Sequence, residues 1–358
     1  MNLTDFGWND HFASLFEPYR STGLTPARVI RQHRERCVLM MERGEVTGEV
    51  SGRFRHLAAD RSEYPTTGDW VAAEPSGENL AVIHAVLPRR SAFTRKVAGE
   101  LTEPQVVAAN IDTVLLLTGL DANFNVRRIE RYLTTAWDSG ASPVIVLNKA
   151  DLRPDIEEIK AEVGLIAAGI PVVAVSALEG SQIDTLLPFL APRKTAALLG
   201  SSGVGKTTLI NRLLGEQRYR TQQVSDSVSR GRHTTTHREL VVLPNGALLI
   251  DTPGMRELQL WADDESLGKS FEEIESLTAQ CRFADCRHQN EPGCAVQAAL
   301  ADGSLDAERF ESYLKQRKEL KFLTLKQDSK ARKQAEKVRG RHFAAMLKEV
   351  KRRKPNLR

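Results

Sequence analysis

The sequence predicts a multidomain protein with an N-terminal OB-like β-barrel, a central α/β domain and a C-terminal helical domain. Three patterns support this fold class. Short strand-like segments, separated by glycines and charged residues, fill residues 26–96. Between residues 111 and 254, near-continuous apolar strands alternate with amphipathic helices, which is typical of a parallel sheet covered on both faces. Beyond residue 294 the pattern is helical.

Composition excludes several classes of protein. The chain has 358 residues, of which 41% are hydrophobic and 27% charged, as in a soluble globular protein of two or three domains. Its longest apolar runs, such as VLLL at 114–117, are strand-sized, and the first residues lack a basic segment followed by an apolar one. We therefore expect a cytoplasmic protein with no membrane partner.

Charge is distributed unevenly along the chain. Residues 315–358 contain 17 Lys/Arg against 4 Asp/Glu, a net of +13, and the other residues carry 33 against 42, a net of −9. A basic tail on an acidic body is suited to binding a polyanion. The alternative is a solvated and partly disordered end.

Residues 26–100 are predicted to form the barrel, from five strand-like segments. The third of these, GEVTGEVSGRFRH, extends over residues 44–56. The length favours an OB-like barrel, but strand count alone does not fix topology, so a five-stranded SH3-like barrel stays open. Residues 1–25 show no strong periodicity and are expected to form a loosely held N-terminal arm.

A phosphate-binding loop is predicted where GSSGVGKT fits the pattern G-x-x-x-x-G-K-[ST], between the strand TAALL and the helical segment TTLINRLL. The glycines let backbone N–H groups converge on phosphate oxygens, and the positive end of the following helix faces the same point. Lys206 should reach the outer phosphates, and the hydroxyl of Thr207 should hold Mg²⁺. The residues of this predicted loop are Gly200, Ser201, Ser202, Gly203, Val204, Gly205, Lys206, Thr207 and Thr208.

A second phosphate element is the string DTPG at 251–254. Asp251 ends a buried strand, where its carboxylate can hold a magnesium-bound water. The N–H of Gly254 can approach a γ-phosphate. Together with the phosphate loop, this turn predicts a nucleoside triphosphate site.

The string NKAD at 148–151 selects the base. The carboxylate of Asp151 can accept hydrogen bonds from N1–H and the 2-amino group of guanine, whereas adenine would leave it unpaired. Asn148 is expected to address the opposite edge of the base, and the stem of Lys149 to cover the ring. Ser176 and the N–H of Ala177, in the next strand end, can face the guanine O6. The sequence therefore favours GTP over ATP.

These elements occur in an unusual order, with the base-reading motifs before the phosphate loop. The carboxyl ends of parallel strands form one site wherever the chain begins, provided that the strands keep their places in the sheet. The order therefore predicts a circularly permuted P-loop GTPase domain over residues 101–270, opened before the strand at 111–119. The cut leads the segment after DTPG directly into the C-terminal module.

Residues 271–358 are predicted to form a zinc-binding module with a basic helical tail. Three thiols and one imidazole occur in the spacing C-x4-C-x-H-x5-C, a closed donor set suited to one structural Zn²⁺. The ligands are Cys281, Cys286, His288 and Cys294. Reduced core cysteines are the alternative. Cys37 lies in an apolar strand and is expected to be core.

A short basic cluster follows the barrel strands and suggests contact with RNA. Its charged residues surround one aromatic ring, so phosphate contact and base stacking could combine. The candidates are Arg89, Arg90, Phe93, Arg95 and Lys96. The alternative is a surface loop anchored by Phe93.

The barrel, the permuted domain and the strings GSSGVGKTTL, GRHTTT, DTPG and CRFADCRHQNEPGC resemble the ribosome small subunit-dependent GTPase family, RsgA, over residues 26–300. The resemblance implies a GTP hydrolase that binds the immature small ribosomal subunit and its rRNA. It also implies turnover stimulated by the subunit and a role late in maturation. Ser201 and Thr207-Thr208 depart mildly from the family pattern.

Hydrolysis is expected to need help from a partner or another part of the chain. Many GTPases place glutamine after the DTPG glycine to orient the attacking water, and this chain has Met255. His233 can accept a proton from water, and the family resemblance points to the same residue. Thr235 is expected to close over the γ-phosphate and magnesium, and Lys206 to complete the catalytic set.

Two functions are consistent with these patterns. The first is a monomeric, GTP-gated assembly factor that binds the small ribosomal subunit, hydrolyses GTP to GDP and phosphate, and holds Mg²⁺ with the nucleotide. The alternative is a signalling or transport switch whose barrel and zinc module bind protein.

Overall fold

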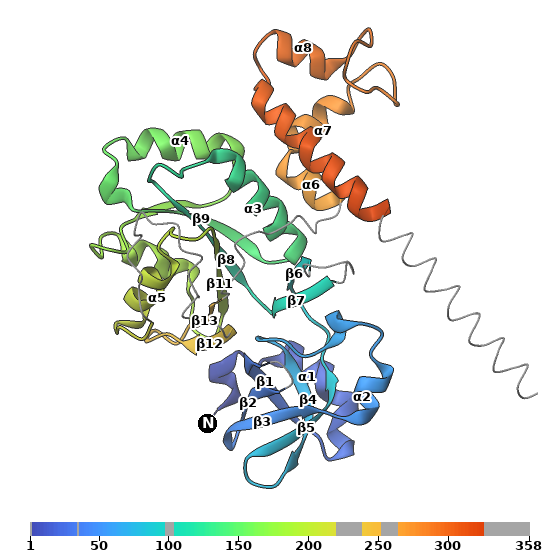
Figure 1. Ribbon diagram of the computed structural model, residues 1–358, viewed down its shortest axis with the longest axis vertical. Coiled ribbons are helices and arrows are strands. Elements are labelled where there is room, and N and C mark those ends of the chain that lie inside the picture. The colour runs from blue at the N-terminus through green and yellow to red at the C-terminus, as the bar shows by residue number, and fades with distance from the viewer. Residues whose placement is uncertain (1, 34–35, 97–103, 220–237, 252–263, 326–358) are drawn as a thin grey trace, which may run out of the picture.

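The computed structural model describes residues 2–33, 36–96, 104–219, 238–251 and 264–325. Its three parts follow one another along the long axis of the molecule (Figure 1). The barrel lies at one end, the α/β domain in the middle and a helical module at the other end. In these ranges no helix has both the length and the apolar character that a membrane span requires.

The N-terminal residues pack against the barrel and are not the loosely held arm expected from the sequence. They form two 3₁₀ segments, η1 (Leu3–Phe6) and η2 (Glu17–Thr22), on either side of the helix α1 (Asp10–Phe16). Phe12 is buried, and its ring centroid lies 5.7 Å from that of Trp70 in the barrel. Aromatic contacts of this kind leave no periodic signal in so short a segment.

Five strands close the barrel in the order of an OB fold. The strands are β1 (Thr25–Gln32), β2 (Cys37–Met41), β3 (Gly44–Val50), β4 (Trp70–Ser76) and β5 (Leu80–Val86). Their order is β1-β2-β3-β5-β4, and β4 pairs back with β1. The parallel pairing of β3 with β5 decides between the two predicted barrels, because an SH3-like meander has no such pair.

A helix follows β3 where the sequence prediction continued the strand to residue 56. The hydroxyl of Ser51 accepts the N–H of Phe54 and starts α2 (Gly52–Leu57). Residues 52–56 therefore belong to a helix, although their sequence pattern also fits a strand, because Ser51 caps the first turn.

The central domain contains a six-stranded part of the same sheet. Its strands are β8 (Thr113–Gly119), β9 (Ser142–Asn148), β10 (Val172–Val175), β11 (Thr195–Gly200), β12 (Arg238–Val242) and β13 (Leu248–Asp251). They lie in the order β10-β9-β8-β11-β13-β12, with all neighbours parallel except β12 and β13. The sequence prediction of a parallel sheet is confirmed.

Helices cover both faces of this sheet, as the apolar strands predict. Alternate residues of β8 belong to two clusters: Leu116 packs with α3 (Val126–Ser139) and α4 (Ile156–Ile166), and Leu117 packs with α5 (Lys206–Leu214). The segment SQIDTLLPFL contains a 3₁₀ helix, η5 (Ile183–Phe189), in place of the expected α-helix. Another short 3₁₀ turn, η4 (Ala150–Leu152), follows β9.

The barrel and the central domain share one continuous sheet. Strand β1 pairs antiparallel with β12, so that Arg31 lies opposite Glu239. The guanidinium of Arg31 lies 2.5 Å from the Glu239 carboxylate. Glu239 also accepts hydrogen bonds from Arg218 and Tyr219.

A hairpin that the sequence did not predict joins the two domains. It consists of β6 (Ala92–Lys96) and β7 (Pro104–Ala109). Just before it, Arg89 makes a bidentate ion pair with the fully buried carboxylate of Asp69, with both N–O distances at 2.8 Å. Arg89 also donates to the carbonyl oxygens of Ser62 and Tyr64. This arginine therefore holds together the loop that connects β3 and β4.

The helical module has its own core. It contains α6 (Asp264–Ser270), α7 (Glu272–Thr278), α8 (Ala295–Ala301) and a C-terminal helix over residues 307–325. Phe271 and Tyr313 are buried at its centre, and their ring centroids lie 5.6 Å apart. This module docks on α3 of the central domain (Figure 1).

Replacing Arg89 should destabilise the barrel strongly. In Arg89→Met the buried carboxylate of Asp69 loses its ion partner, so we expect unfolding to cost about 3–5 kcal/mol less than in the parent chain. Urea unfolding followed by tryptophan fluorescence measures the difference. The matched control is Arg36→Met, because the Arg36–Glu49 pair is solvent-exposed and should contribute less than about 1 kcal/mol. Equal effects of the two substitutions would contradict the structural role of Arg89.

Candidate nucleotide and metal sites

The motifs that stand far apart in the sequence meet at the carboxyl edge of the central sheet. In the register of the strands, Asn148 at the end of β9 lies opposite Gly119 of β8 and Val175 of β10. On the other side of β8, Gly200 at the end of β11 lies opposite Leu117. β13 ends in Asp251 on the same edge. The predicted phosphate loop, base-reading motifs and acidic strand end therefore surround one region.

The phosphate loop turns through two left-handed glycines before α5 begins at Lys206. Gly203 and Gly205 have φ angles of +78° and +95°, which side chains rarely adopt. The ammonium of Lys206 folds back on the loop and donates to the carbonyl oxygens of Gly200 and Ser201, at 2.6 and 2.7 Å. A cation is thus held within the loop, at the point where phosphate oxygens would lie.

Asn148 joins the phosphate loop to the base-reading loops. Its side-chain amide donates to the carbonyl of Val204 at 2.7 Å, and its oxygen accepts the N–H of Ala177 at 3.0 Å. A Cβ at position 205 would lie only 2.3 Å from this amide nitrogen, so Gly205 is required by the contact as well as by its φ angle. The sequence analysis expected Asn148 to address the edge of the base. In the structure both ends of its amide also have protein partners, and its role at the base stays a prediction.

Lys149 and Asp151 lie at the rim of the same region. Lys149 has a left-handed backbone, and its ammonium lies 2.5 Å from the carboxylate of Asp121. Burial pushes the pKa of Asp121 upward, but hydrogen bonds from Lys149 and from the N–H of Asn123 leave that pKa below its usual value. The Lys149 stem is therefore anchored by a carboxylate. The Asp151 side chain is exposed.

The second base-reading loop is supported from α5. Ser176 and Ala177 are buried, and Arg212 of α5 donates to the carbonyl oxygens of Ala177 and Leu178. Sequence reasoning missed Arg212 and Asp121. An arginine two turns after a phosphate loop and an aspartate just past a strand end could have pointed to them, but their partners lie far away in the sequence.

Asp251 is buried at the end of β13. Burial raises the pKa of its carboxyl to about 6, although the charge of Lys206 opposes this rise. A carboxyl with such a pKa loses its proton just below neutral pH, where it can hold a metal-bound water. Four sequence-predicted residues of this region, His233, Thr235, Gly254 and the residue Met255 beside it, lie outside the described residues.

The predicted zinc ligands come together in the helical module. One donor atom from each of Cys281, Cys286, His288 and Cys294 lies within 4.8 Å of the others. Nδ1 of His288 lies 3.6 Å from Sγ of Cys281 and 3.5 Å from Sγ of Cys294. Three thiols and one imidazole form a closed tetrahedral donor set, which fits structural Zn²⁺.

The surroundings of this cluster favour metal binding. Burial acts to raise the pKa of Cys281, but the N–H groups of Ala295 and Val296 bring that pKa below its usual value, which favours the thiolate. The carboxylate of Glu291 accepts the backbone N–H groups of residues 287, 289 and 290 and orders the loop around His288. Cys37 stands apart in β2, where burial raises its pKa to about 12, as expected of a core thiol.

Two of the RNA-contact candidates are not available at the surface. Phe93 is 1% exposed in the core shared by the barrel and the central domain, so its ring cannot stack on a base. The guanidinium of Arg89 is occupied by Asp69. Arg90 is half-exposed and lies 3.4 Å from Asp112. For Arg95 and Lys96 the structure describes only their backbone, in β6.

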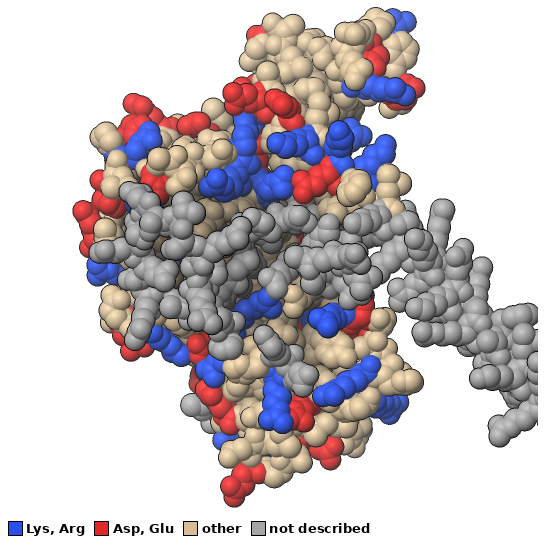
Figure 2. Space-filling model, in the orientation of Figure 1, with Lys and Arg blue, Asp and Glu red and all other residues tan. Residues whose placement is uncertain are grey.

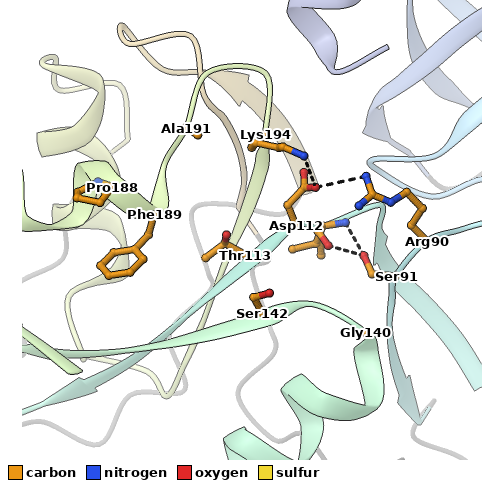
Figure 3. A pocket seen from close by; sticks show the side chains of 11 residues that line it. Arg90, Ser91, Asp112, Thr113, Gly140, Ser142, Pro188, Phe189, Ala191 and Lys194 are labelled. Carbon is orange, nitrogen blue, oxygen red and sulfur yellow. Dashed lines mark hydrogen bonds and ion pairs between the residues drawn. The ribbon is translucent and has the colours of Figure 1, made fainter. Parts of the chain in front are cut away.

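A polar cavity of about 360 Å³ lies at the opposite, amino edge of the sheet, between the barrel and the central domain (Figure 3). Lys194 and Arg90 point toward Asp112 at its rim, at 3.3 and 3.4 Å. None of the predicted nucleotide-binding residues lines it. In the phosphate loop, by contrast, the ammonium of Lys206 is bonded to the loop carbonyls, so this cavity does not mark the predicted nucleotide site.

Comparison with protein families identifies a matching model. The model described as RsgA GTPase matches residues 86–261. A second model, described as ABC transporter, matches residues 189–344, a range that includes the phosphate loop, which is a motif shared by many P-loop proteins.

Solved structures share the fold. A structure described as YjeQ from Thermotoga maritima is 28% identical, has a TM-score of 0.62, and covers 83% of this chain and 98% of its own. A structure described as YloQ, a circularly permuted GTPase, is 22% identical and has a TM-score of 0.59, with 83% of this chain and 95% of its own covered. The permuted order predicted from the motifs is confirmed.

Relatives with closely similar sequences settle the family. The small ribosomal subunit biogenesis GTPase RsgA of Opitutus terrae is 53% identical, with 92% of both chains covered. The protein of the same name from Syntrophotalea carbinolica is 46% identical over the same shares. A chain with this order of motifs, this fold and these relatives belongs to the RsgA family of circularly permuted GTPases.

Proposed function

We propose that the protein binds the small ribosomal subunit late in its maturation and hydrolyses GTP there, with turnover stimulated by the subunit. The observation that carries the proposal is the convergence of the phosphate loop, Asn148 and Asp251 on one edge of the sheet. The relatives named as small ribosomal subunit biogenesis GTPases support this partner. They do not support the alternative, a signalling or transport switch.

Each protein group has a defined task in binding. The carboxylate of Asp151 accepts hydrogen bonds from guanine, and the stem of Lys149, anchored by Asp121, covers the ring. Lys206 leaves the loop carbonyls and takes up the outer phosphates, and the loop N–H groups share the remaining charge. Thr207 and Asp251 are the residues that would hold Mg²⁺ and its bound water. When bound, the metal neutralises charge on the phosphates.

Hydrolysis depends on groups that the partner brings into place. Met255 cannot orient a water, so we propose His233 as general base and Thr235 as the residue that closes over the γ-phosphate. A Zn²⁺ ion held by Cys281, Cys286, His288 and Cys294 would fix the helical module and would leave no open position for catalysis.

The distribution of positive charge on the protein supports binding to the RNA of the ribosomal partner. Figure 2 shows Lys and Arg side chains gathered where α3 meets the C-terminal helix. Beyond this helix, the chain continues into the rest of the basic segment 315–358. We propose that the protein acts as a cytoplasmic monomer that reaches rRNA with this side and with Arg90, Arg95 and Lys96.

Base selectivity can be tested at Asp151. In Asp151→Asn we expect affinity for GDP to fall by about 100-fold or more, because an amide cannot accept both hydrogen bonds of guanine. Xanthosine diphosphate should bind this variant better than GDP does, since xanthine presents an oxygen in place of the 2-amino group. Titration with fluorescent nucleotides measures both. Asp155→Asn is the matched control, and a GDP affinity unchanged by Asp151→Asn would exclude Asp151 from the base site.

Magnesium-dependent nucleotide binding should depend on pH through Asp251. A proton and a metal-bound water compete for a carboxyl with a pKa of about 6, so affinity should fall by up to about tenfold per pH unit below that value and level off above about 7. Asp251→Asn should remove this component. Because the phosphates of the nucleotide titrate in both proteins, the informative quantity is the difference between the two pH profiles. Identical profile shapes would argue against a magnesium role for Asp251.

Turnover with purified small subunits tests the proposed function itself. We expect slow GTP hydrolysis alone and a clear increase with subunits, weakened by salt. His233→Ala should lower the stimulated rate by about 10²–10⁴-fold while leaving GDP affinity unchanged. Stimulated turnover that survives this substitution would remove His233 from the mechanism. Binding to neither subunits nor rRNA would favour the alternative function.

A further inference from the structure

Helix α3 touches the phosphate loop with one of its faces. Arg128 donates to the hydroxyl of Ser201 at 3.4 Å and to the carbonyl of Asn123 at 3.2 Å. The phenol of Tyr132, one turn further along α3, also interacts with the side chain of Ser201. Residues four apart share a face of a helix, so both side chains converge on the second residue of the loop.

The opposite side of α3 holds the helical module through a buried carboxylate, since residues two apart lie about 200° apart around a helix. Glu130 is fully buried and accepts hydrogen bonds from three side chains: Arg127 at 2.6 Å, Arg309 at 2.8 Å and Ser312 at 2.6 Å. Arg309 is itself buried and donates to Glu273 and to the carbonyl of Ser270. One arginine thus joins α3 to two helices of the zinc-binding module.

Further contacts extend this docking along the C-terminal helix. Thr134 donates to the side chain of Gln316 at 3.2 Å, and Arg131 lies 2.8 Å from Glu319. Thr134 lies on the side of α3 that carries Glu130, because residues four apart share a face, and Arg131 lies about 100° further around the helix. Arg309, Gln316 and Glu319 follow one another along one side of their own helix. The two helices therefore contact each other along several turns.

The surroundings of Ser201 differ between the structure, in which Lys206 contacts it, and the proposed nucleotide-bound state. The connection between the loop and α3 can therefore respond to nucleotide. Its carbonyl now accepts a hydrogen bond from Lys206 at 2.7 Å. In the proposed function, on which this step rests, Lys206 moves to the phosphates of the nucleotide, so the carbonyl of Ser201 loses its partner while its hydroxyl keeps Arg128. A change at the loop therefore reaches α3 directly, along a path separate from the segment after DTPG.

We propose that α3 couples nucleotide binding in the phosphate loop to docking of the zinc-binding module, with Arg128 and Glu130 as the positioning residues at its two contacts. Linkage makes the coupling reciprocal: a docked module holds α3 and preorganises the loop for phosphate, and a bound nucleotide tightens the docking. The module is thereby a regulatory partner of the nucleotide site.

A double-mutant cycle in the full-length protein tests the coupling. GDP affinity is measured for the parent chain, Arg128→Met, Arg309→Met and the double variant. We expect each single substitution to weaken GDP binding about three- to tenfold, and the double variant to bind no more weakly than Arg128→Met alone. Arg128 contacts the phosphate loop and Arg309 contacts Glu130, so the two arginines share no partner. Non-additive effects of their substitutions would therefore be transmitted through α3. Effects that multiply would overturn the proposal.

Hydrogen exchange supplies the reciprocal measurement. GDP should slow exchange in residues 307–325 of the parent chain and have no such effect in Arg128→Met. The control variant is Lys318→Met, on the exposed side of the same helix. Its GDP affinity, and the slowing of its exchange by GDP, should equal those of the parent chain. Zinc content and thermal unfolding verify the fold of each variant. Unaltered exchange on GDP binding to the parent chain would contradict the proposal.

Two further results separate the possible failures. If Arg309→Met does not fold, Glu130→Gln replaces it in the cycle, because it keeps the shape of the side chain while removing the charge that holds Arg309. A parent chain that fails to bind GDP would refute the proposed nucleotide site. A parent chain that binds GDP, with multiplying effects in the cycle, would refute only the coupling.

Discussion

The candidate nucleotide site depends on the hydrogen bonds of the Asn148 side chain. They join the end of β9 to the loops that follow β10 and β11. The Asn148 amide bonds to the carbonyl of Val204 in the phosphate loop and to the N–H of Ala177 in the second base-reading loop. Asn148 ends β9 between β8 and β10, and its contact with Val204 requires position 205 to lack a Cβ. A buried amide with both ends satisfied is costly to disturb, since loss of either partner leaves an unpaired polar group. The phosphate loop and the second base-reading loop are therefore joined through Asn148 by protein contacts alone.

Circular permutation preserves this geometry while changing what is attached to it. The strands keep their neighbours, so the carboxyl edge of the sheet is unaffected by where the chain starts. The new connections place the barrel beside β12, through Arg31 and Glu239, and the zinc-binding module beside α3, through Glu130 and Arg309. Both attachments use buried or half-buried ion pairs whose partners are more than 170 residues apart. Loss of either member of such a pair leaves a buried charge without its counter-ion, which destabilises the folded protein. Each attachment therefore requires both of its charged residues.

Burial explains why some surface predictions were wrong and others stay predictions. A basic cluster around one aromatic ring suggested RNA contact, but Phe93 belongs to the core and Arg89 neutralises the buried Asp69. Arginine and phenylalanine can serve RNA contact or the protein interior, and only their partners in the fold distinguish these two roles. The N-terminal residues were likewise expected to be loose, because their few aromatic residues show no period, yet Phe12 and Trp70 pack together. The roles of Arg90, Arg95 and Lys96 stay predictions.

The sequence by itself determined the fold class, the permuted order and the Cys3His cluster, and it predicted the nucleotide-binding residues, because these depend on short motifs and on local periodicity. GSSGVGKT, NKAD and C-x4-C-x-H-x5-C each place their functional atoms within one loop or turn. Only the tertiary structure decided the OB topology of the barrel, the two protein bonds of Asn148, and the roles of Asp121, Arg212 and Glu130. These features pair residues that lie far apart in the chain. Local pattern cannot specify such pairs, since strand register and helix docking are set by packing of the whole domain.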